Sequence, residues 1–266
     1  MDILTEKYEA LCEALRALGS AAVAFSGGVD STLLLAAARA ALGDRCAAVT
    51  VRSAFFPARE ARAAEDLCAA LGAERIALDA DVLAVPGVAE NPPERCYLCK
   101  RAVMGMVLDA ARARGLAAVV EGSNLDDDPA ERPGARALRE LGVRSPLREA
   151  QLTKAEIRAL SRRLGLPTAD KPAMACLATR FPTGAALTPE GLRRVEAAEE
   201  ALDAAVPSLA QRRVRVHGDL ARIEASPAQL ALVAEQAAAL DAALRALGFS
   251  RVTLDLGGYR MGSMNR

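Results

Sequence analysis

One glycine-rich segment of the sequence has the residue types of a phosphate-binding loop. The stretch "FSGGVDST" places Ser26, Gly27, Gly28, Asp30 and Ser31 between a short apolar run and a long helical pattern. Glycines let backbone N–H groups approach an anion closely, and the N-terminus of the following helix favours negative charge. The serine hydroxyls can donate to phosphate oxygens, whereas the carboxylate is suited to hold a divalent cation, Mg²⁺, that bridges those oxygens. The pattern predicts a nucleotide site without the lysine of a Walker-type loop; a plain helix-capping turn is the alternative.

The cysteines divide into a close pair and single residues. Cys96 and Cys99 are spaced as C-x-x-C, which in an intracellular chain indicates metal or redox chemistry rather than a disulfide framework. Cys176 lies in the proline-bounded stretch "MACLATRF", close to Arg180, whose guanidinium can lower the thiol pKa and activate the thiolate as a nucleophile. An inert small hydrophobe, a metal ligand and a reactive thiol all remain open for this residue. The others follow helical or strand-like patterns and are predicted to be buried in the core: Cys12, Cys46 and Cys68.

The elements that must position these groups alternate along the first part of the chain. Besides the strand and helix that flank the glycine-rich turn, strands are predicted in 46–53, 74–80 and 117–124, and helices in about 3–18, 58–72 and 99–115. This alternation predicts the α/β class, with a parallel, doubly wound sheet. Ligands bind at the carboxyl ends of the strands in such sheets. We therefore expect the glycine-rich turn, Ser53, Gly122 and Asn124 at one edge.

The pattern changes after about residue 135. Thr188 is predicted to cap a helix that has Pro189 at its first position. The predicted elements are helices in 137–142 and 153–165, a proline-rich connector over 166–184, a helix over 188–205, two strands around the turn 217–219, a helix over 227–247 and a strand over 251–256. We therefore expect a first domain over 1–170 and a smaller C-terminal α+β domain over 171–266.

Composition excludes several classes of protein. Of the 266 residues, 52% are hydrophobic and 26% are charged, which is typical of a globular chain with a sizeable core. The formal net charge is +0, so no global basic field attracts nucleic acid, and nucleic acid is not expected as a partner. The N-terminal segment has the pattern of a charged amphipathic helix rather than a signal peptide, and no apolar run has transmembrane length. We expect a cytoplasmic protein without a membrane partner.

The glycine-rich loop and a second segment resemble those of a known superfamily. S-G-G-x-D-S after the first strand resembles the signature of the PP-loop ATP pyrophosphatases, which have an adenine nucleotide α-hydrolase-like sheet, and "EGSNLDDD" over 121–128 is similar to their Gly-Thr/Ser-Asn-x-Asp-Asp segment. The resemblance implies an enzyme that uses ATP and Mg²⁺, splits ATP between its α and β phosphates and adenylates a carbonyl oxygen. It also implies that Asp126 and Asp127 bind magnesium or position polar groups; a solvated acidic loop is the alternative.

Segments over almost the whole chain resemble one family of that superfamily, the ATP-dependent sulfur transferases of the LarE type. They are "RCYLCK" (95–100), "RPGARALRELGVRSPL" (132–147), "PAMACLATRFPTG" (172–184), "VEAAEEAL" (195–202), "RVRVHGDLARIEA" (213–225) and "GYRMGS" (258–263). The resemblance implies that the carboxylates of pyridinium-3,5-biscarboxylic acid mononucleotide are adenylated in turn. A cysteine at the position of Cys176 then forms a thioester, and cleavage of its Cβ–S bond leaves a thiocarboxylate on the product and dehydroalanine on the enzyme. The product leads to the nickel-pincer nucleotide cofactor of lactate racemase.

The sequence differs from family members that sacrifice the sulfur of their own cysteine. Together with Cys176, the pair Cys96 and Cys99 can hold three irons of a [4Fe–4S] cluster, as in similar members whose open iron is taken to carry the donated sulfide. We therefore favour cluster-borne sulfur over sacrifice of the Cys176 sulfur. Structural zinc is a smaller alternative because it needs a fourth ligand, and His217, the sole histidine, is expected to be a turn residue. A tyrosine that the family often carries is missing at 129–131, so no role is transferred there.

Charged residues of the C-terminal domain match positions with substrate-binding roles in the family. Arg213 and Arg215 share one face of a predicted strand, and their likeness to the family's "RVR" implies that they bind the substrate phosphate. An exposed basic strand edge is the alternative. Glu199 matches a helix glutamate that binds metal or orients substrate, although Glu196 and Glu200 lie beside it.

The resemblance also implies partners, and other functions stay open. The implied partners are further copies of the chain, a sulfide donor and a downstream nickel-insertion protein. One alternative is a PP-loop enzyme that thiolates transfer RNA, which needs a basic surface or an RNA-binding module. Another alternative is a nucleotide-binding regulatory module. A further one is an amide-forming enzyme, but that function leaves the three cysteines unexplained. Binding of transfer RNA or pyridinium mononucleotide, and release of pyrophosphate, distinguish these functions.

Overall fold

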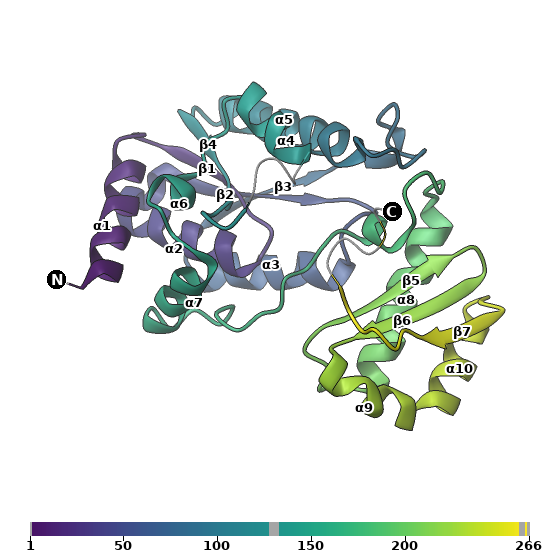
Figure 1. Cartoon of the computed structure of the whole chain (residues 1–266). Coiled ribbons are helices and arrows are strands. Elements are labelled where there is room, and N and C mark those ends of the chain that lie inside the picture. The colour runs from purple at the N-terminus through teal and green to yellow at the C-terminus, as the bar shows by residue number, and fades with distance from the viewer. Residues whose placement is uncertain (1, 128–132, 261–263, 265–266) are drawn as a thin grey trace. The chain divides into compact units, whose positions relative to one another are not determined.

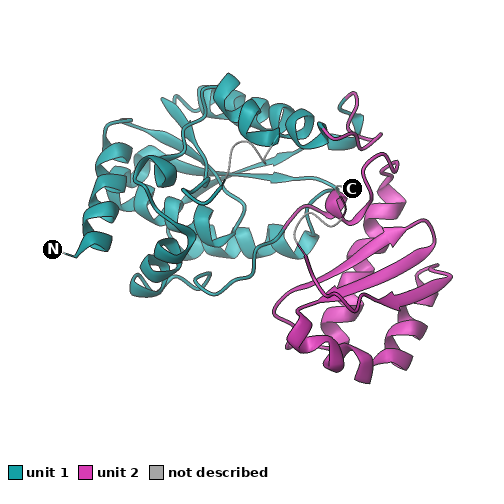
Figure 2. Cartoon of the chain, in the orientation of Figure 1, with its two compact units in different colours: residues 1–85, 94–174 teal, residues 86–93, 175–266 magenta. Residues whose placement is uncertain are grey.

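The computed structural model describes residues 2–127, 133–260 and 264 of the chain. The end of the 121–128 segment, the departure at 129–131, the first residue of 132–147 and the end of 258–263 lie outside the described residues. The chain forms two compact units: unit 1 contains residues 1–85 and 94–174, and unit 2 contains residues 86–93 and 175–266 (Figure 2). The predicted domain boundary between residues 170 and 171 stays a prediction.

A parallel sheet forms the centre of unit 1. Its strands are β1 (Ala21–Ala24), β2 (Cys46–Arg52), β3 (Glu74–Asp79) and β4 (Ala118–Val120), and they lie in the order β3-β2-β1-β4. The pairs β1–β2, β1–β4 and β2–β3 are all parallel, with Val23 opposite both Ala48 and Val120. Strands buried on both faces consist of near-continuous small apolar residues, as in "AAVA". The predicted α/β class is confirmed.

Helices cover both faces of this sheet (Figure 1). One face carries α1 (Ile3–Arg16), α2 (Val29–Leu42), α3 (Ala58–Ala70), α6 (Pro146–Glu149) and α7 (Lys154–Arg163), whose apolar side chains share one core. The other face carries α4 (Arg95–Ala113) and α5 (Pro133–Glu140). Short 3-10 turns η1 (Gly43–Arg45) and η2 (Val82–Ala84) join strands to helices. Helix α2 is buried along most of its length, which explains its alanine- and leucine-rich sequence.

Two boundaries in unit 1 differ from the sequence-based expectation. Helix α4 begins at Arg95 rather than near residue 99, because Arg95 is buried and the helix starts directly after the proline pair at 92–93. Both residues of the C-x-x-C motif are therefore helical. Strand β4 ends at Val120, so the rest of the predicted strand over 117–124 is the loop that carries polar residues toward the carboxyl edge.

Unit 2 is a small α+β fold. Strands β5 (Arg212–His217) and β6 (Leu220–Ala225) form an antiparallel hairpin, and β7 (Arg251–Leu254) pairs parallel to β6. Helix α8 (Pro189–Ala205) packs on β5, and Thr188 caps it as predicted, since its side chain accepts a hydrogen bond from the Gly191 N–H at 3.0 Å. A 3-10 turn, η3 (Leu177–Arg180), follows Cys176.

The helix predicted over 227–247 is wrong as a single element. The chain forms a 3-10 turn η4 (Pro227–Gln229), then α9 (Leu230–Glu235) and α10 (Ala237–Ala246). The break falls at Gln236, which has turn geometry with φ −100° and ψ 14°. The alanine-rich sequence favours helix throughout and contains no proline or glycine at this point, so it does not indicate the break.

Among the described residues, no helix combines the length and apolarity that a membrane crossing requires.

Candidate active site

The glycine-rich loop forms the turn between β1 and α2. Gly27 has φ +68°, and a Cβ at this position would lie 3.3 Å from the Ala64 Cβ, so both the backbone conformation and the space favour glycine. Gly28 is the N-cap of α2, and no side chain of the described residues caps the helix there. The N–H groups of the first helical turn are left for another acceptor, and the helix dipole favours an anion. The backbone geometry of the loop therefore suits a phosphate, and its binding of one stays a prediction.

The two loop serines contact each other. The Ser31 hydroxyl donates to the Gly28 carbonyl at 3.2 Å, and its oxygen lies 3.2 Å from the Ser26 Oγ. Ser26 is exposed, whereas Ser31 is buried. Their expected donation to phosphate oxygens stays a prediction, and Ser26 has the solvent access that it needs.

Asp30 is held by groups from two distant segments. Its Oδ1 accepts a hydrogen bond from Asn124 Nδ2 at 3.2 Å, and its Oδ2 lies 2.5 Å from Lys154 Nζ. Gly122 brings the loop after β4 close to α2, since a Cβ there would lie 3.1 Å from the Ser31 nitrogen. Asn124 and Gly122 therefore meet the glycine-rich turn at the sheet edge.

Two lysines missed by the sequence reasoning lie against this loop. Lys154 pairs with Asp30, and Lys171 Nζ lies 3.0 Å from the Gly27 carbonyl oxygen and 2.6 Å from Glu60 Oε2. Both side chains are partly exposed. Although the loop itself has no lysine, the fold supplies ammonium groups that can neutralise phosphate charge.

The acidic segment after β4 shapes its own loop. Asp127 Oδ2 accepts from the Asn124 N–H at 3.1 Å, while Asp126 Oδ2 accepts from the Lys154 N–H at 2.7 Å at the start of α7. Buried Glu121 was not anticipated; it accepts from the Ser123 N–H and from two hydroxyl groups. The carboxylates thus order the loop that contacts Asp30. A magnesium role for Asp126 and Asp127 stays a prediction.

Ser53 follows β2 and stabilises a turn. Its Oγ accepts from the Phe55 N–H at 3.2 Å, and the side chain is half-buried. Because β2 pairs with β1, the ends of both strands lie at the same edge. A direct contact of Ser53 with nucleotide stays a prediction.

The cysteines have different environments. Near the start of α4, Cys96 is exposed and Cys99 is half-buried, and Arg95 Nη2 lies 3.3 Å from the Cys96 sulfur. Cys176 is half-buried in unit 2. Within the described part of the chain, no three His, Cys, Asp or Glu side chains are arranged to hold a metal ion. The other thiols are buried as predicted, and burial raises their pKa values: Cys12, Cys46 and, to about 11, Cys68.

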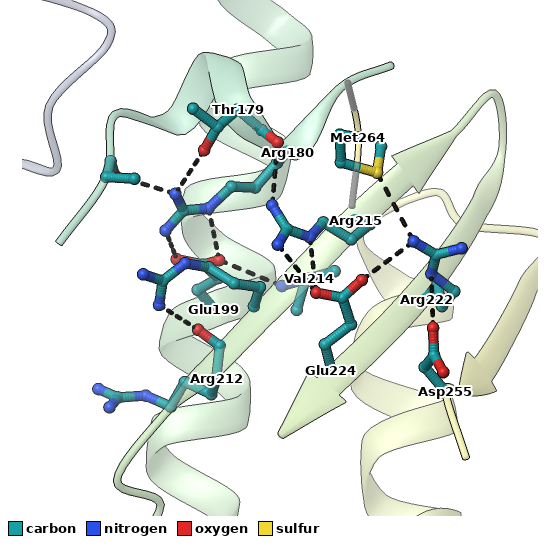
Figure 3. A network of polar contacts seen from close by, with 12 residues as sticks. Thr179, Arg180, Glu199, Arg212, Val214, Arg215, Arg222, Glu224, Asp255 and Met264 are labelled. Carbon is teal, nitrogen blue, oxygen red and sulfur yellow. Dashed lines mark hydrogen bonds and ion pairs between the residues drawn. The ribbon is translucent and has the colours of Figure 1, made fainter. Parts of the chain in front are cut away.

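A buried guanidinium anchors the backbone at Cys176. Arg180 is 0% exposed, and its Nη1 donates to the carbonyls of Ala175 at 2.9 Å and Cys176 at 3.2 Å. Its Nε and Nη2 donate to the two carboxylate oxygens of Glu199 at 2.8 and 2.9 Å. Arg180 therefore holds the segment that carries the thiol against α8 (Figure 3). Activation of the thiol by Arg180 stays a prediction.

Glu199 is the buried acid of its helix. Glu196 is half-buried and Glu200 is exposed, whereas Glu199 also accepts a hydrogen bond from the Val214 N–H at 3.1 Å. Burial alone would raise the pKa of Glu199, but the hydrogen bonds and charge of Arg180 outweigh it and lower that pKa. The carboxylate is thus kept ionised inside unit 2.

Arg213 and Arg215 belong to the same network. The alternative of an exposed basic edge is wrong, because each is only 4% exposed. Arg215 donates to Glu224 Oε2 at 2.8 Å and to the Thr179 carbonyl at 3.0 Å (Figure 3). The Arg213 guanidinium lies 5.1 Å from the centre of the Tyr259 ring. Burial lowers the pKa of Arg213, and the nearby positive charge of Arg180 lowers it further. Glu224, 0% exposed, was missed because nothing local in "ARIEA" marks it as a partner.

His217 lies at the end of β5 in an exposed position. Burial of part of its ring lowers its pKa. The described residues around it form no metal-ligand group, and its role as a turn residue stays a prediction.

The parallel sheet with the S-G-G-x-D-S turn at its carboxyl edge defines a PP-loop enzyme. Residues 20–89 match the protein family described as "Queuosine biosynthesis protein QueC". The chain is also 30% identical to a glutamine-hydrolysing GMP synthase of Aeropyrum pernix over 55% of this chain and 31% of that protein. The family match covers the part of the chain that carries the loop.

Two relatives match over the full length. The chain is 39% identical to the pyridinium-3,5-bisthiocarboxylic acid mononucleotide synthase of Lactiplantibacillus plantarum, over 100% of this chain and 96% of that protein. It is also 39% identical to an uncharacterised protein of Synechocystis, over 99% and 98% of the two chains. The chain belongs to the LarE-type family of ATP-dependent sulfur transferases.

Proposed function

We propose that this enzyme adenylates the carboxylates of pyridinium-3,5-biscarboxylic acid mononucleotide and converts them to thiocarboxylates. The observation that carries the proposal is the full-length similarity to a protein named as the synthase of the bisthiocarboxylic acid product. In the adenylation step a carboxylate oxygen attacks the α-phosphorus of ATP, and the bond to pyrophosphate breaks. A sulfur nucleophile then attacks the activated carbonyl, and AMP leaves.

The loop of unit 1 is suited to ATP and magnesium. The glycine turn and the uncapped start of α2 fit a phosphate, and Asp30 offers the carboxylate oxygens that Mg²⁺ prefers. When bound, Mg²⁺ neutralises charge on the phosphate oxygens. Lys154, which pairs with Asp30 in the structure, is then available to contact phosphate. Ser26 and Ser31 donate to the same group.

The three remaining cysteines are the candidate sulfur machinery. Cys96 and Cys99 are three residues apart on one helix face, form no disulfide and are at least partly accessible, which fits two ligands of a [4Fe–4S] cluster. We propose that Cys176 is the third ligand. When bound, such a cluster supplies sulfide at its open iron. In the sacrificial alternative, the Cys176 thiolate itself attacks, and its sulfur stays with the product.

Unit 2 is suited to the phosphate of the mononucleotide. Arg213 and Arg215 lie 5.1 and 5.9 Å from the ring of Tyr259 and alternate on one face of β5. Arg180 and Glu199 act as positioning residues in this proposal, since they hold the backbone of Cys176. We also propose that the enzyme works in the cytoplasm as a homo-oligomer. A sulfide donor and a nickel-insertion protein would precede and follow it.

Cys176→Ala tests the sulfur assignment. The variant is expected to release pyrophosphate with ATP and substrate but to form no thiocarboxylate, as measured by product mass spectrometry. Cys12→Ala, which removes a buried thiol, is the matched control and should keep both activities. Sulfur-bearing product at wild-type yield from Cys176→Ala would contradict the assignment.

Anaerobic iron and sulfide analysis separates the two routes. A cluster predicts brown protein with about four irons, and Cys96→Ala and Cys99→Ala should both lose the colour. Colourless protein whose mass falls by about one H₂S after turnover would favour sacrifice of the Cys176 sulfur. Substantial binding of transfer RNA instead of pyridinium mononucleotide would redirect the proposal to RNA thiolation.

A further inference from the structure

One ammonium group holds a carbonyl of the glycine-rich loop. Lys171 Nζ donates to the Gly27 carbonyl oxygen at 3.0 Å and to Glu60 Oε2 at 2.6 Å. All three residues belong to unit 1. The side chains of Lys171 and Glu60 are only 21% and 19% exposed, so solvent competes little for this contact. The carbonyl of the loop therefore has a fixed donor.

The backbone of Lys171 is anchored as well. Arg158 of α7 donates from Nη1 to the Ala169 carbonyl at 2.5 Å and from Nη2 to the Lys171 carbonyl at 2.9 Å. The Lys171 N–H donates to the Thr168 carbonyl at 3.0 Å. Although Lys171 is 144 residues from Gly27 in the chain, it thus reaches the loop from a segment that is itself held in place.

Helix α3 contacts the same turn at two points. Glu60 binds Lys171, and Ala64 lies four residues later, on the same face of the helix. A Cβ at Gly27 would lie 3.3 Å from the Ala64 Cβ. The helix therefore limits the position of Gly27, while Lys171 holds its carbonyl.

The peptide unit between Gly27 and Gly28 needs such a hold. Glycine adopts positive and negative φ about equally well, so two glycines in a row offer little steric resistance to rotation of the peptide between them. The unit is planar and trans, so its C=O and N–H point in opposite directions. A carbonyl of Gly27 that faces Lys171 therefore directs the Gly28 N–H to the other side.

We propose that Lys171, held by Glu60, is a positioning residue that keeps the Gly28 N–H directed at the nucleotide phosphate. The proposal rests on the proposed function, because it takes the loop to bind ATP. Gly28 is the N-cap of α2, where backbone N–H groups suit an anion. The reverse orientation of the peptide would present a carbonyl oxygen to the phosphate and repel it. The apparent dissociation constant rises by the inverse of the fraction of enzyme that has the competent orientation.

Substitution of Glu60 separates positioning from simple charge neutralisation. If Lys171 only supplied positive charge to the phosphate, Glu60→Ala would raise the local charge by one, and ATP would bind as well or better. In the positioning role the variant loosens Lys171, and the dissociation constant of ATP with Mg²⁺ should rise at least threefold, measured by isothermal titration calorimetry. Glu65→Ala removes a 2.8 Å ion pair with Arg75 from the same helix and should bind ATP like wild type.

Lys171→Met completes a double-mutant cycle. It removes the ammonium group but keeps an unbranched side chain, and it should raise the dissociation constant at least tenfold, as expected when less than about a tenth of the enzyme keeps the competent peptide. Because Glu60 acts through Lys171, the double variant should bind ATP no more weakly than Lys171→Met alone. Effects that multiply in the double variant would overturn the proposal. Circular dichroism checks that each variant is folded.

The Gly28 amide gives a readout that a general loss of stability would not move. In protein labelled with [¹⁵N]glycine, its resonance is the one that disappears in Gly28→Ala. Without ATP this resonance should move in Lys171→Met and Glu60→Ala but stay in place in Glu65→Ala. An unmoved resonance in the first two variants would overturn the proposal.

The calorimetry also distinguishes this proposal from the proposed function. Wild type that binds ATP, together with Glu60→Ala that binds it equally well or better, would overturn the positioning role and leave the proposed function intact. Wild type that binds no ATP in the presence of Mg²⁺ would overturn both.

Discussion

The buried ion pair between Arg180 and Glu199 predicts a large loss of stability for Glu199→Gln. The pair is bidentate, and its side chains are only 0% and 4% exposed. Removing one partner of such a pair leaves a buried charge uncompensated, which costs about 3–5 kcal/mol. The amide oxygen of the substituted side chain would still accept the Val214 N–H, so we expect the lower end, about 3 kcal/mol, or about a hundredfold change in the folding equilibrium.

Urea unfolding followed by far-UV circular dichroism measures this loss, since the chain has no Trp to report by fluorescence. Glu190→Gln is the matched control, because it removes an exposed pair with Arg193 on the same helix and should leave stability unchanged. A loss below about 1 kcal/mol for Glu199→Gln would refute the reasoning that the carboxylate is ionised and desolvated in the folded state.

The pH dependence gives an independent check. Because the folded-state pKa of Glu199 is lowered, its contribution is present above the unfolded pKa of 4.5 and is lost as pH falls through the folded value. The stability difference between wild type and Glu199→Gln should therefore be constant near neutral pH and shrink below about pH 4.5. A difference that grows on acidification would contradict the sign of the shift.

Other predictions concern unit 1. Gly27→Ala should lower the free energy of unfolding by about 1–3 kcal/mol and reduce pyrophosphate release, because φ at Gly27 is +68°. Gly28→Ala should keep its stability, and equal stability of the two variants would argue against backbone strain at Gly27. Lys154→Ala should raise the KM for ATP at least tenfold, since a charged hydrogen bond contributes about 1.5–3 kcal/mol, and an unchanged KM would exclude phosphate contact. In native protein at pH 8, Cys96 should react with iodoacetamide while Cys68, with a pKa of about 11, stays unlabelled in peptide mass maps; rapid labelling of the latter would count against its burial.

Local patterns were enough to predict the parallel sheet and the segments that lie at its carboxyl edge. Apolar runs of strand length alternate with helical patterns, and the glycine-rich turn follows the first run, so the carboxyl edge could be located without coordinates. Gly122 and Asn124 reach this edge because a parallel strand delivers them there. Whether a helix or a strand forms depends mainly on residues that are close together in the chain, so the sequence alone can indicate it.

Contacts between distant residues could not be predicted in the same way. Lys154 and Lys171 approach the loop across 124 and 144 residues of sequence, and no local pattern distinguishes them from solvated lysines. Proximity to Cys176 in the sequence drew attention to Arg180 and the resemblance drew attention to Glu199, but only the packing of α8 on η3 shows that they pair. Burial of an arginine or a glutamate depends on the partner that satisfies it, and that partner is set by tertiary structure.

The short stretch 86–93 limits how unit 2 can be isolated. Although it lies far upstream in the chain, the Asn91 amide donates to the Pro182 carbonyl at 2.8 Å, and its own carbonyl accepts from the Gly184 N–H at 2.8 Å. The Ala89 carbonyl likewise accepts from the Leu187 N–H at 2.7 Å. A fragment that begins at residue 175 would lack these bonds. A C-terminal fragment made by truncation or protease cleavage therefore lacks a peptide that completes the fold of unit 2.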